Sequence, residues 1–133
     1  MTEDVRTIEE TATIGQAFEI MENEGIRHLP VVRGRELVGM LSDRDLRSYG
    51  LSMVTDLEGV ERAKARLGSK VATMMSANLI TVTPDTDVAE IVDLMLEERI
   101  HAVPVIEEES NELVGIVTTV DMLGAVRDQL AAE

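Results

Sequence analysis

The sequence contains no cysteine and no tryptophan, and its 133 residues include only one tyrosine and one phenylalanine. The absence of cysteine excludes a disulfide framework and any thiolate metal site. So few aromatic side chains exclude a base-stacking platform for single-stranded nucleic acid. No apolar run approaches the roughly 18 residues that a membrane span needs, and the N-terminus lacks the basic start and apolar stretch of a signal peptide. We therefore expect a cytoplasmic protein.

Positively charged residues are also few. Twelve Lys and Arg stand against 26 Asp and Glu, which gives a formal net charge of −14. Nucleic-acid phosphates and anionic membrane surfaces attract basic proteins, so neither is expected as a partner. Hydrophobic residues make up 44% of the chain. This composition and length indicate a globular protein with a core of its own.

The chain does contain an internal repeat. Residues 25–32 (GIRHLPVV) match 99–106 (RIHAVPVI), and residues 36–46 (ELVGMLSDRDL) match 112–122 (ELVGIVTTVDM). The offset therefore grows from 74 residues (99 − 25) to 76 (112 − 36). The two additional residues fall in a polar segment, which predicts a hairpin tip, where a change of length is best tolerated.

Each copy is predicted to contain the elements β-α-β-β-α. A first helix is indicated by apolar residues at i, i+3, i+4 and i+7, preceded by short β-type runs at 5–8 and 79–84. Hairpins ending in strands 37–41 and 113–117 come next, followed by helices from about Asp43 and Thr119. The predicted class is α/β (α+β), with two three-stranded sheets that carry helices on one face and bury the other face in one pseudo-symmetric unit. The apolar positions of the first helices are Ile14, Ala17, Phe18 and Met21, then Val88, Ile91, Val92 and Met95.

A helical linker is expected between the copies. Val60, Ala63, Lys64 and Leu67 keep helical spacing, with Asp56 as the predicted N-cap and Gly68 as the stop. Ser69 is a candidate cap for a further short helix over 70–75. The predicted organisation is a first repeat over 1–55, a linker over 56–75 and a second repeat over 76–133.

Two short motifs are the best candidates for chemistry. Residues 39–45 (GMLSDRD) and 115–121 (GIVTTVD) each place a hydroxyl at the end of a strand and an aspartate three positions later. The pattern alone favours helix capping, because Ser or Thr followed by an acidic residue forms a capping box. The functional alternative is a ligand site, in which the hydroxyl and helix N–H groups hold a phosphate and the aspartate accepts from a ribose diol. Gly39 and Gly115 would let a ligand or a neighbouring backbone come close.

The ordered set of motifs resembles the cystathionine-β-synthase (CBS) domain, and the tandem resembles a Bateman module. The resemblance covers residues 5–50 and 76–128. It implies that an adenosine-containing ligand, such as AMP, ADP, ATP or S-adenosylmethionine, binds in the cleft between the copies. The matching segments are 26–31 (IRHLPV) and 39–45 in the first copy, and 80–84 (ITVTP), 100–105 (IHAVPV) and 115–121 in the second.

The same resemblance implies a set of ligand-binding residues. The hydroxyl and aspartate of each motif would contact phosphate and ribose. Residues of the first strand and of the start of the second strand would contact the base and phosphates. By position these residues are Ser42, Asp45, Thr118 and Asp121, then Thr81, Thr83, Ile26, Arg27, Ile100 and His101.

The two copies differ in charge near these positions. The first copy has Glu9 and Glu10 where the second has Thr83 and Pro84, and these carboxylates are expected to repel phosphate. It also offers Arg27, His28 and Arg44, which can neutralise phosphate, although Arg44 is equally well explained as a solvated residue at a helix start. The second copy has Val120 at the position of Arg44. We therefore expect the two sites to prefer different ligands, or one site to be empty.

Other interpretations find less support. His28 and His101 lack a third nearby ligand, so no metal site is expected, and the run Glu107–Glu109 is a solvated hairpin tip. The methionines are core filler, although Met74, Met75, Leu46 and Leu123 are also candidates for a dimer surface. There is no Walker A, no G-x-S-x-G and no cysteine nucleophile, and nothing makes His28 a base for Ser42.

The sequence therefore predicts a non-catalytic sensor rather than an enzyme. Ligand binding would shift the conformation or packing of the module and pass that change to a partner by linkage. A homodimer is expected, with an enzyme or transporter as the regulated partner and no cofactor beyond the adenosine ligand. The alternative is a structural dimerisation module without a ligand, in which Asp45 and Asp121 only cap helices.

Overall fold

A computed structural model describes residues 5–48 and 57–132 of the chain. Its contacts divide these residues into two compact units. The first unit spans residues 6–79, and the second unit consists of Val5 and residues 80–132. The predicted repeat boundaries at residues 55 and 75 stay a prediction.

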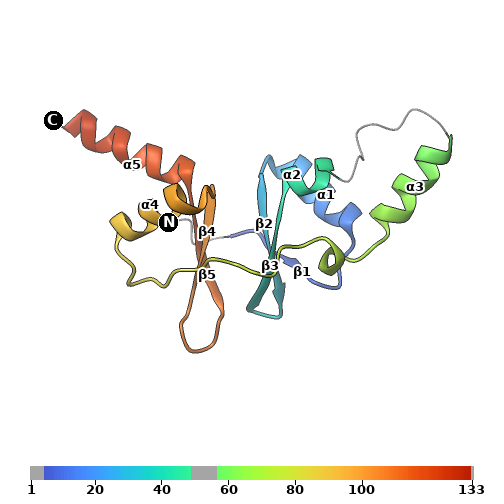
Figure 1. Ribbon diagram of the computed structural model, residues 1–133, viewed down its shortest axis with the longest axis horizontal. Helices are drawn as coiled ribbons and strands as arrows, with labels where there is room; N and C mark the ends of the chain where they lie inside the picture. Colours follow the sequence, from blue (N-terminus) through green and yellow to red (C-terminus); the bar gives the residue numbers. More distant parts are fainter. Residues whose placement is uncertain (1–4, 49–56, 133) are drawn as a thin grey trace. The chain divides into compact units, whose positions relative to one another are not determined.

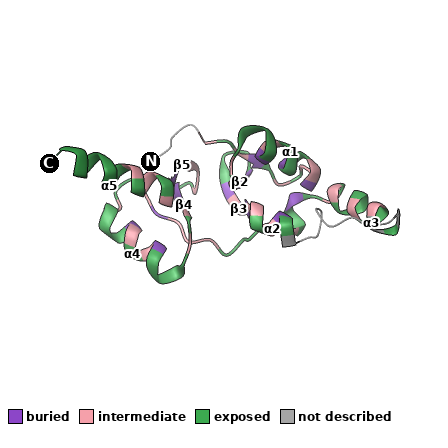
Figure 2. Cartoon of the chain, turned by 90° about the horizontal axis from the view of Figure 1, so that it is seen from above, coloured by how far each residue is buried: buried purple, intermediate pink, exposed green. Residues whose placement is uncertain are grey.

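The first unit is built on a three-stranded sheet. Strand β1 (Ile8–Glu9) runs parallel to β2 (His28–Arg33), and β2 pairs antiparallel with β3 (Glu36–Ser42). Helix α1 (Ile14–Glu24) connects the parallel strands, and α2 (Asp43–Ser48) follows β3. Both helices lie on the same side of the sheet (Figures 1 and 2), which confirms the predicted order β-α-β-β-α.

Residues beyond the first repeat complete this unit. Helix α3 (Leu57–Leu67) packs on α1, and a 3-10 turn, η1 (Val71–Thr73), follows it. Val71 is fully buried in the core, with Met74 and Met75 packed against it. The backbone of residues 69–76 bonds to the repeat at three places: Ile14 N–H to Ser69 O (2.8 Å), Val71 N–H to Ala12 O (2.8 Å), and Met40 with Ser76 in both directions (3.0 Å each). We call residues 69–76 the strap.

The second unit repeats the plan with a smaller sheet. Strand β4 (Ala102–Ile106) pairs antiparallel with β5 (Leu113–Thr118), and helices α4 (Val88–Glu98) and α5 (Thr119–Ala132) lie on the same side of them (Figures 1 and 2). The strand predicted over 79–84 is reduced to one parallel bridge between Val82 and Val105. The chain turns directly afterwards at Pro84, where Thr86 N–H bonds to Thr83 O (3.1 Å), so the pairing cannot extend.

The hairpins of the two units agree in detail. Both carry a register shift at the same repeat position, after Val31 and after Val105. The first hairpin turns between Arg33 and Glu36, and the second between Ile106 and Leu113. The additional two residues of the second copy therefore lie at the hairpin tip, as the sequence predicts.

Several sequence predictions need correction. The first strand begins at Ile8, so the run predicted over 5–8 contributes only its last residue. Ser69 does not cap a following helix, because its hydroxyl donates to Ala65 O at the end of α3 (3.3 Å), and the predicted helix over 70–75 is only the turn η1. Leu46 is buried in the first core and so does not line an outer surface. The predicted cap Asp56 lies outside the described residues.

Two apolar positions of the first helices are also more exposed than predicted. Phe18 is 40% exposed and Val88 is 61% exposed, whereas Ile14, the counterpart of Val88, is fully buried. Ile14 is covered because α3 and the strap pack on α1. In the first unit, α3 and the strap come after α2. The described residues of the second unit contain no counterpart of them after α5. None of the described helices is long and apolar enough to cross a lipid bilayer.

Candidate functional site

Each motif forms a reciprocal capping box at the start of the helix after the hairpin. In the first unit, Asp45 N–H donates to Ser42 Oγ (3.2 Å), and Ser42 N–H donates to Asp45 Oδ2 (3.0 Å). In the second unit, Asp121 N–H donates to Thr118 Oγ1 (3.2 Å), and Thr118 N–H donates to Asp121 Oδ2 (2.9 Å). The structural interpretation of the motif is therefore confirmed in both copies. All four side chains are half-buried.

Capping does not use the whole of the second motif. The carboxylate of Asp121 accepts through Oδ2, and among the described residues its Oδ1 has no hydrogen-bond partner. A carboxylate has two oxygens and about four lone-pair positions. The same aspartate can therefore cap its helix and accept from a further hydroxyl.

The start of the second strand lies beside each motif. In the first unit His28 pairs with Ser42, and Asp43 N–H donates to Arg27 O (2.9 Å). In the second unit Ala102 pairs with Thr118, and Thr119 N–H donates to His101 O (3.0 Å). Antiparallel pairing of the hairpin strands makes this juxtaposition unavoidable, because the first residue of one strand faces the last residue of the other.

The structure thereby gathers most of the predicted site residues into two groups. Arg27, Arg44 and His101 are exposed, and the other members are half-buried. Ile26 and Ile100 also pack against the cores of their own units. The group of the first unit is Ile26, Arg27, His28, Ser42, Arg44 and Asp45, and that of the second unit is Ile100, His101, Thr118 and Asp121.

Thr81 and Thr83 do not join the second group within their unit. They flank Val82, whose bridge is with Val105 near the far end of β4. At about 3.3 Å per residue, this register separates them from the start of β4 by about 10 Å. Thr83 is also engaged locally, since its N–H donates to Thr86 Oγ1 (3.1 Å) and the two hydroxyls lie 3.3 Å apart.

The carboxylates that were expected to repel phosphate in the first unit face its hairpin tip. Arg33 Nε donates to Glu10 Oε1 (2.6 Å), and Gly34 N–H donates to Glu9 Oε2 (3.3 Å). The hydrogen bond from Arg33 and its positive charge lower the pKa of Glu10, and the same contact raises the pKa of Arg33. The charge of Glu10 is therefore compensated within the unit, so its predicted effect on phosphate is weaker than the sequence suggests.

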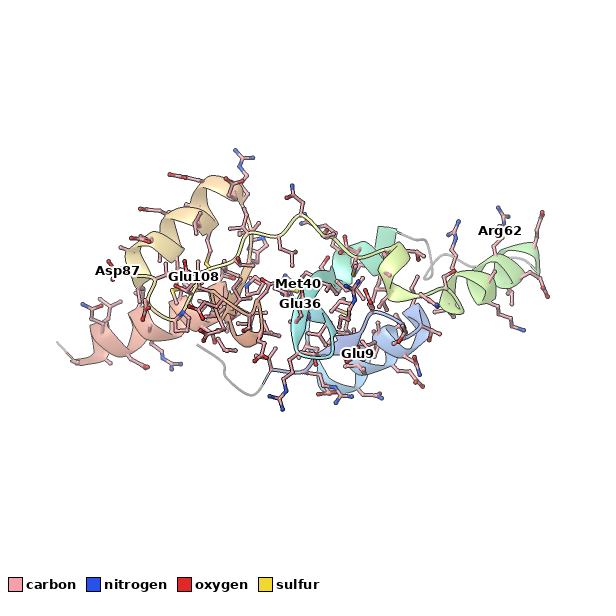
Figure 3. All side chains as sticks on the ribbon, turned by 90° about the horizontal axis from the view of Figure 1, so that it is seen from below. Glu9, Glu36, Met40, Arg62, Asp87 and Glu108 are labelled. Carbon is pink, nitrogen blue, oxygen red and sulfur yellow. The ribbon has the colours of Figure 1, made fainter. Side chains whose placement is uncertain are left out.

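Gly39 has a role that the sequence did not identify. The side chain of Met75, in the strap, fills the space where a Cβ of residue 39 would lie. The neighbouring Met40, labelled on β3 in Figure 3, forms the two backbone hydrogen bonds to Ser76. The close approach predicted for the motif glycine is therefore made by a methionine of the chain itself. No local signal pairs residues 36 positions apart (75 − 39), so the sequence could not reveal it.

Comparisons with known proteins agree with this architecture. A family model described as CBS domain matches residues 1–52 and 71–128. Inosine-5'-monophosphate dehydrogenase of Methanocaldococcus jannaschii is 30% identical over 121 residues, which are 90% of this chain and 21% of that protein. CBS domain-containing protein YhcV of Bacillus subtilis is 30% identical over 122 residues, covering 92% of this chain and 79% of that protein.

A solved structure gives the same result. The CBS domain pair of protein MJ0100, in complex with 5′-methylthioadenosine and S-adenosyl-L-methionine, matches with a TM-score of 0.77 and 25% identity. The match covers 97% of this chain and 93% of that chain. The chain thus belongs to the CBS domain family and carries two such domains in tandem. It spans about a fifth of the length of the dehydrogenase and about four fifths of YhcV.

Proposed function

We propose that this CBS-domain pair is a non-catalytic regulatory module that binds an adenosine-containing ligand, such as AMP, ATP or S-adenosylmethionine. The hydroxyl and aspartate of each motif would contact the ligand's phosphate or ribose. The start of the second strand would supply backbone and side-chain contacts to the rest of the ligand. Ligand binding would shift a conformational equilibrium of the module and pass the change to a regulated partner.

The observation that carries this proposal is the second motif. Asp121 is half-buried at the start of α5, caps through one oxygen and has no further partner among the described residues. Ribose diols are recognised by acidic residues in dinucleotide sites. The related CBS pair of MJ0100 was solved with two adenosine compounds, which supports adenosine as the ligand class.

A thermal-shift screen followed by calorimetry tests the proposal. A ligand at 100 times its Kd stabilises the folded protein by about 2.7 kcal/mol, so adenosine, AMP, ATP and S-adenosylmethionine are each compared with guanosine counterparts where these exist. We expect at least one adenosine compound to raise the melting temperature and the guanosine compounds to leave it unchanged. If no adenosine compound binds the wild type, the proposal is wrong.

Asp121→Asn then separates binding from capping. The amide oxygen can still accept from Thr118 N–H, whereas the charge that strengthens bonds to a ribose diol is lost. Charge-assisted hydrogen bonds contribute about 1.5–3 kcal/mol, so we expect affinity to fall by roughly 10- to 100-fold. Asp128→Asn, on an exposed residue of the same helix, is the matched control and should bind as the wild type does. Equal affinity in Asp121→Asn would assign the aspartate to capping alone.

A structural dimerisation module remains the second candidate, because α5 has an exposed apolar stripe. None of its residues is buried, and the part of the helix after Gly124 is exposed throughout (Figure 2). In this alternative the motif aspartates only cap helices and the module holds two chains together without a ligand. The stripe consists of Val120, Leu123, Val126 and Leu130, which are 75%, 69%, 52% and 66% exposed.

A further inference from the structure

The two motifs are surrounded by different side chains. In the first unit, Arg27 and Arg44 both lie beside Asp43, because Asp43 N–H donates to Arg27 O (2.9 Å) and Arg44 follows Asp43 directly in the chain. Both arginines are exposed, and neither forms an ion pair with any residue that the structure describes. Two guanidinium groups are therefore available at this motif, in a chain that carries more than twice as many acidic as basic residues.

Neither Asp43 nor Asp45 forms an ion pair with Arg27 or Arg44 in the part of the chain that the structure describes. Asp43 is paired with Arg47 of the same helix (3.0 Å), and Asp45 accepts from Ser42 N–H. Arg47, the other cation of this helix, is thus already paired, whereas Arg27 and Arg44 are not. Guanidinium groups bind phosphate oxygens with two parallel hydrogen bonds, so the first motif suits a ligand that carries a phosphate.

The second motif lacks both cations at the equivalent positions. The counterpart of Arg27 is His101, and the counterpart of Arg44 is Val120, an apolar residue that is 75% exposed. Arg99, two residues before His101, is in the left-handed conformation at the end of α4, at the position that corresponds to Gly25. At the position of Arg44, the second motif therefore has the apolar side chain of Val120 instead of a positive charge.

From this contrast we infer that the two motifs discriminate between adenosine ligands. Arg27 and Arg44 make the first motif specific for a phosphorylated adenosine compound. Val120 makes the second motif specific for an adenosine compound with an uncharged, apolar 5′ substituent, such as a thioether. The inference rests on the proposed function and adds to it the ligand class of each motif and the residues that determine it.

Reciprocal substitutions test the inference, with AMP and 5′-methylthioadenosine as probes in calorimetry on the full chain. In Arg44→Val, AMP binding should weaken by roughly 10- to 100-fold, which is the loss expected for charge-assisted hydrogen bonds, while 5′-methylthioadenosine binding stays within about twofold. In Val120→Arg, AMP should gain a second binding event and 5′-methylthioadenosine should bind more weakly. Raising the salt concentration should weaken AMP binding only.

Arg62→Val is the matched control. It removes an exposed arginine from α3, where Arg62 is labelled in Figure 3, and should bind both probes as the wild type does. Melting curves check that each variant folds. Arg27→Gln is a second test variant, just before β2, and its affinity for AMP should fall by the same factor as that of Arg44→Val. The inference is overturned if Arg44→Val weakens both probes equally, or if Arg44→Val and Arg27→Gln leave AMP binding unchanged.

The two proposals fail in different ways. If the wild type binds neither probe, nor any other adenosine compound, the proposed function is wrong and this inference falls with it. If the wild type binds 5′-methylthioadenosine but not AMP, adenosine binding stands and the assignment of the first motif to a phosphorylated ligand is wrong.

Discussion

At the scale of single residues, Glu10 and Arg33 alter how the charge of the first unit is interpreted. In the sequence, Glu10 is an acidic residue next to the predicted first strand, at a position that is proline in the second copy. In the structure, Arg33 donates through Nε (2.6 Å) and Nη2 (3.2 Å) to its two oxygens. This bidentate contact joins the segment after β1 to the hairpin tip. The local field is set by the pair and not by the carboxylate alone.

We predict that Arg33→Gln raises the pKa of Glu10 towards its ordinary value of 4.5, because the hydrogen bond and charge that lower it are lost. A carboxylate with a lowered pKa stabilises the folded state above its unfolded pKa, and that contribution is lost as pH falls through the folded value. The variant should therefore be slightly less stable than the wild type above about pH 4.5, and this difference should disappear as the pH falls through the lowered pKa of Glu10. An NMR titration of the Glu10 carboxyl measures the shift. Arg35→Gln, beside the same turn, should leave it unchanged.

At the scale of elements, the first helix of each repeat ends in the same way with different residues. Helix α1 ends at Gly25 (φ 64°) and α4 at Arg99 (φ 55°), and both residues adopt the left-handed conformation. Their N–H groups donate to Met21 O and Met95 O. Glycine adopts this conformation without a steric penalty, whereas a residue with a Cβ does not. The second repeat therefore carries a local strain that the first does not.

We expect Arg99→Gly to raise the free energy of unfolding by about 0.5–1 kcal/mol. The left-handed conformation costs a residue with a Cβ about 1–2 kcal/mol, and this exceeds the entropy that glycine adds to the unfolded chain, about 0.4–1 kcal/mol. Gly25→Ala should lower the free energy of unfolding, because alanine is strained in the left-handed conformation. Urea denaturation monitored by circular dichroism measures both. Arg62→Gly in the middle of α3 should cost about 1 kcal/mol, and a destabilised Arg99→Gly would contradict the prediction.

The elements that the sequence predicts well are those set by local signals. Turn residues and alternating apolar runs place the two hairpins, and the Ser42 and Thr118 caps fix the starts of α2 and α5. The elements that it predicts poorly depend on distant contacts. The strand over 79–84 shrinks to one bridge because its length depends on the partner strand and on Pro84. The burial of Ile14, in contrast to Val88, depends on α3 and the strap.

At the scale of the whole molecule, α5 carries an apolar surface that the other described residues of its unit do not bury. The apolar stripe defined above lies on a helix of 14 residues with no buried member. Exposed apolar patches on soluble proteins often mark interaction sites, and a C₂ pair is the commonest way to cover one. Of the four residues that the sequence suggested for a dimer surface, only Leu123 is exposed; Leu46 is buried, and Met74 and Met75 pack on the first core.

We predict a homodimer that depends on this stripe. Leu123→Glu should weaken the dimer by at least about tenfold, because it places a charge in an apolar contact. Light scattering at high micromolar concentration should report a dimer for the wild type and a shift towards monomer for the variant. Ala125→Glu adds the same charge on another face of α5, at an exposed position, and should leave the dimer intact. A monomeric wild type would refute this prediction.

The candidate site could be predicted only in part. The motifs, their capping geometry and the start of the second strand follow from the hairpin, which is local in sequence. The position of Thr81 and Thr83 beside the far end of β4 follows from the parallel register, which no pattern in the sequence sets. The contact between Gly39 and Met75 likewise joins residues whose pairing is decided by the folded core.

The strap also has a consequence for how the protein is made. Domains fold as units during synthesis, the N-terminal one first. A growing chain that has reached residue 68 already contains β1, β2 and β3, yet the fully buried Val71 and the methionine that fills the space at Gly39 are still to come. The first unit can close only after the ribosome has added residues up to Ser76. The ribosome must therefore synthesise the chain as far as the start of the second repeat before the first unit can fold completely.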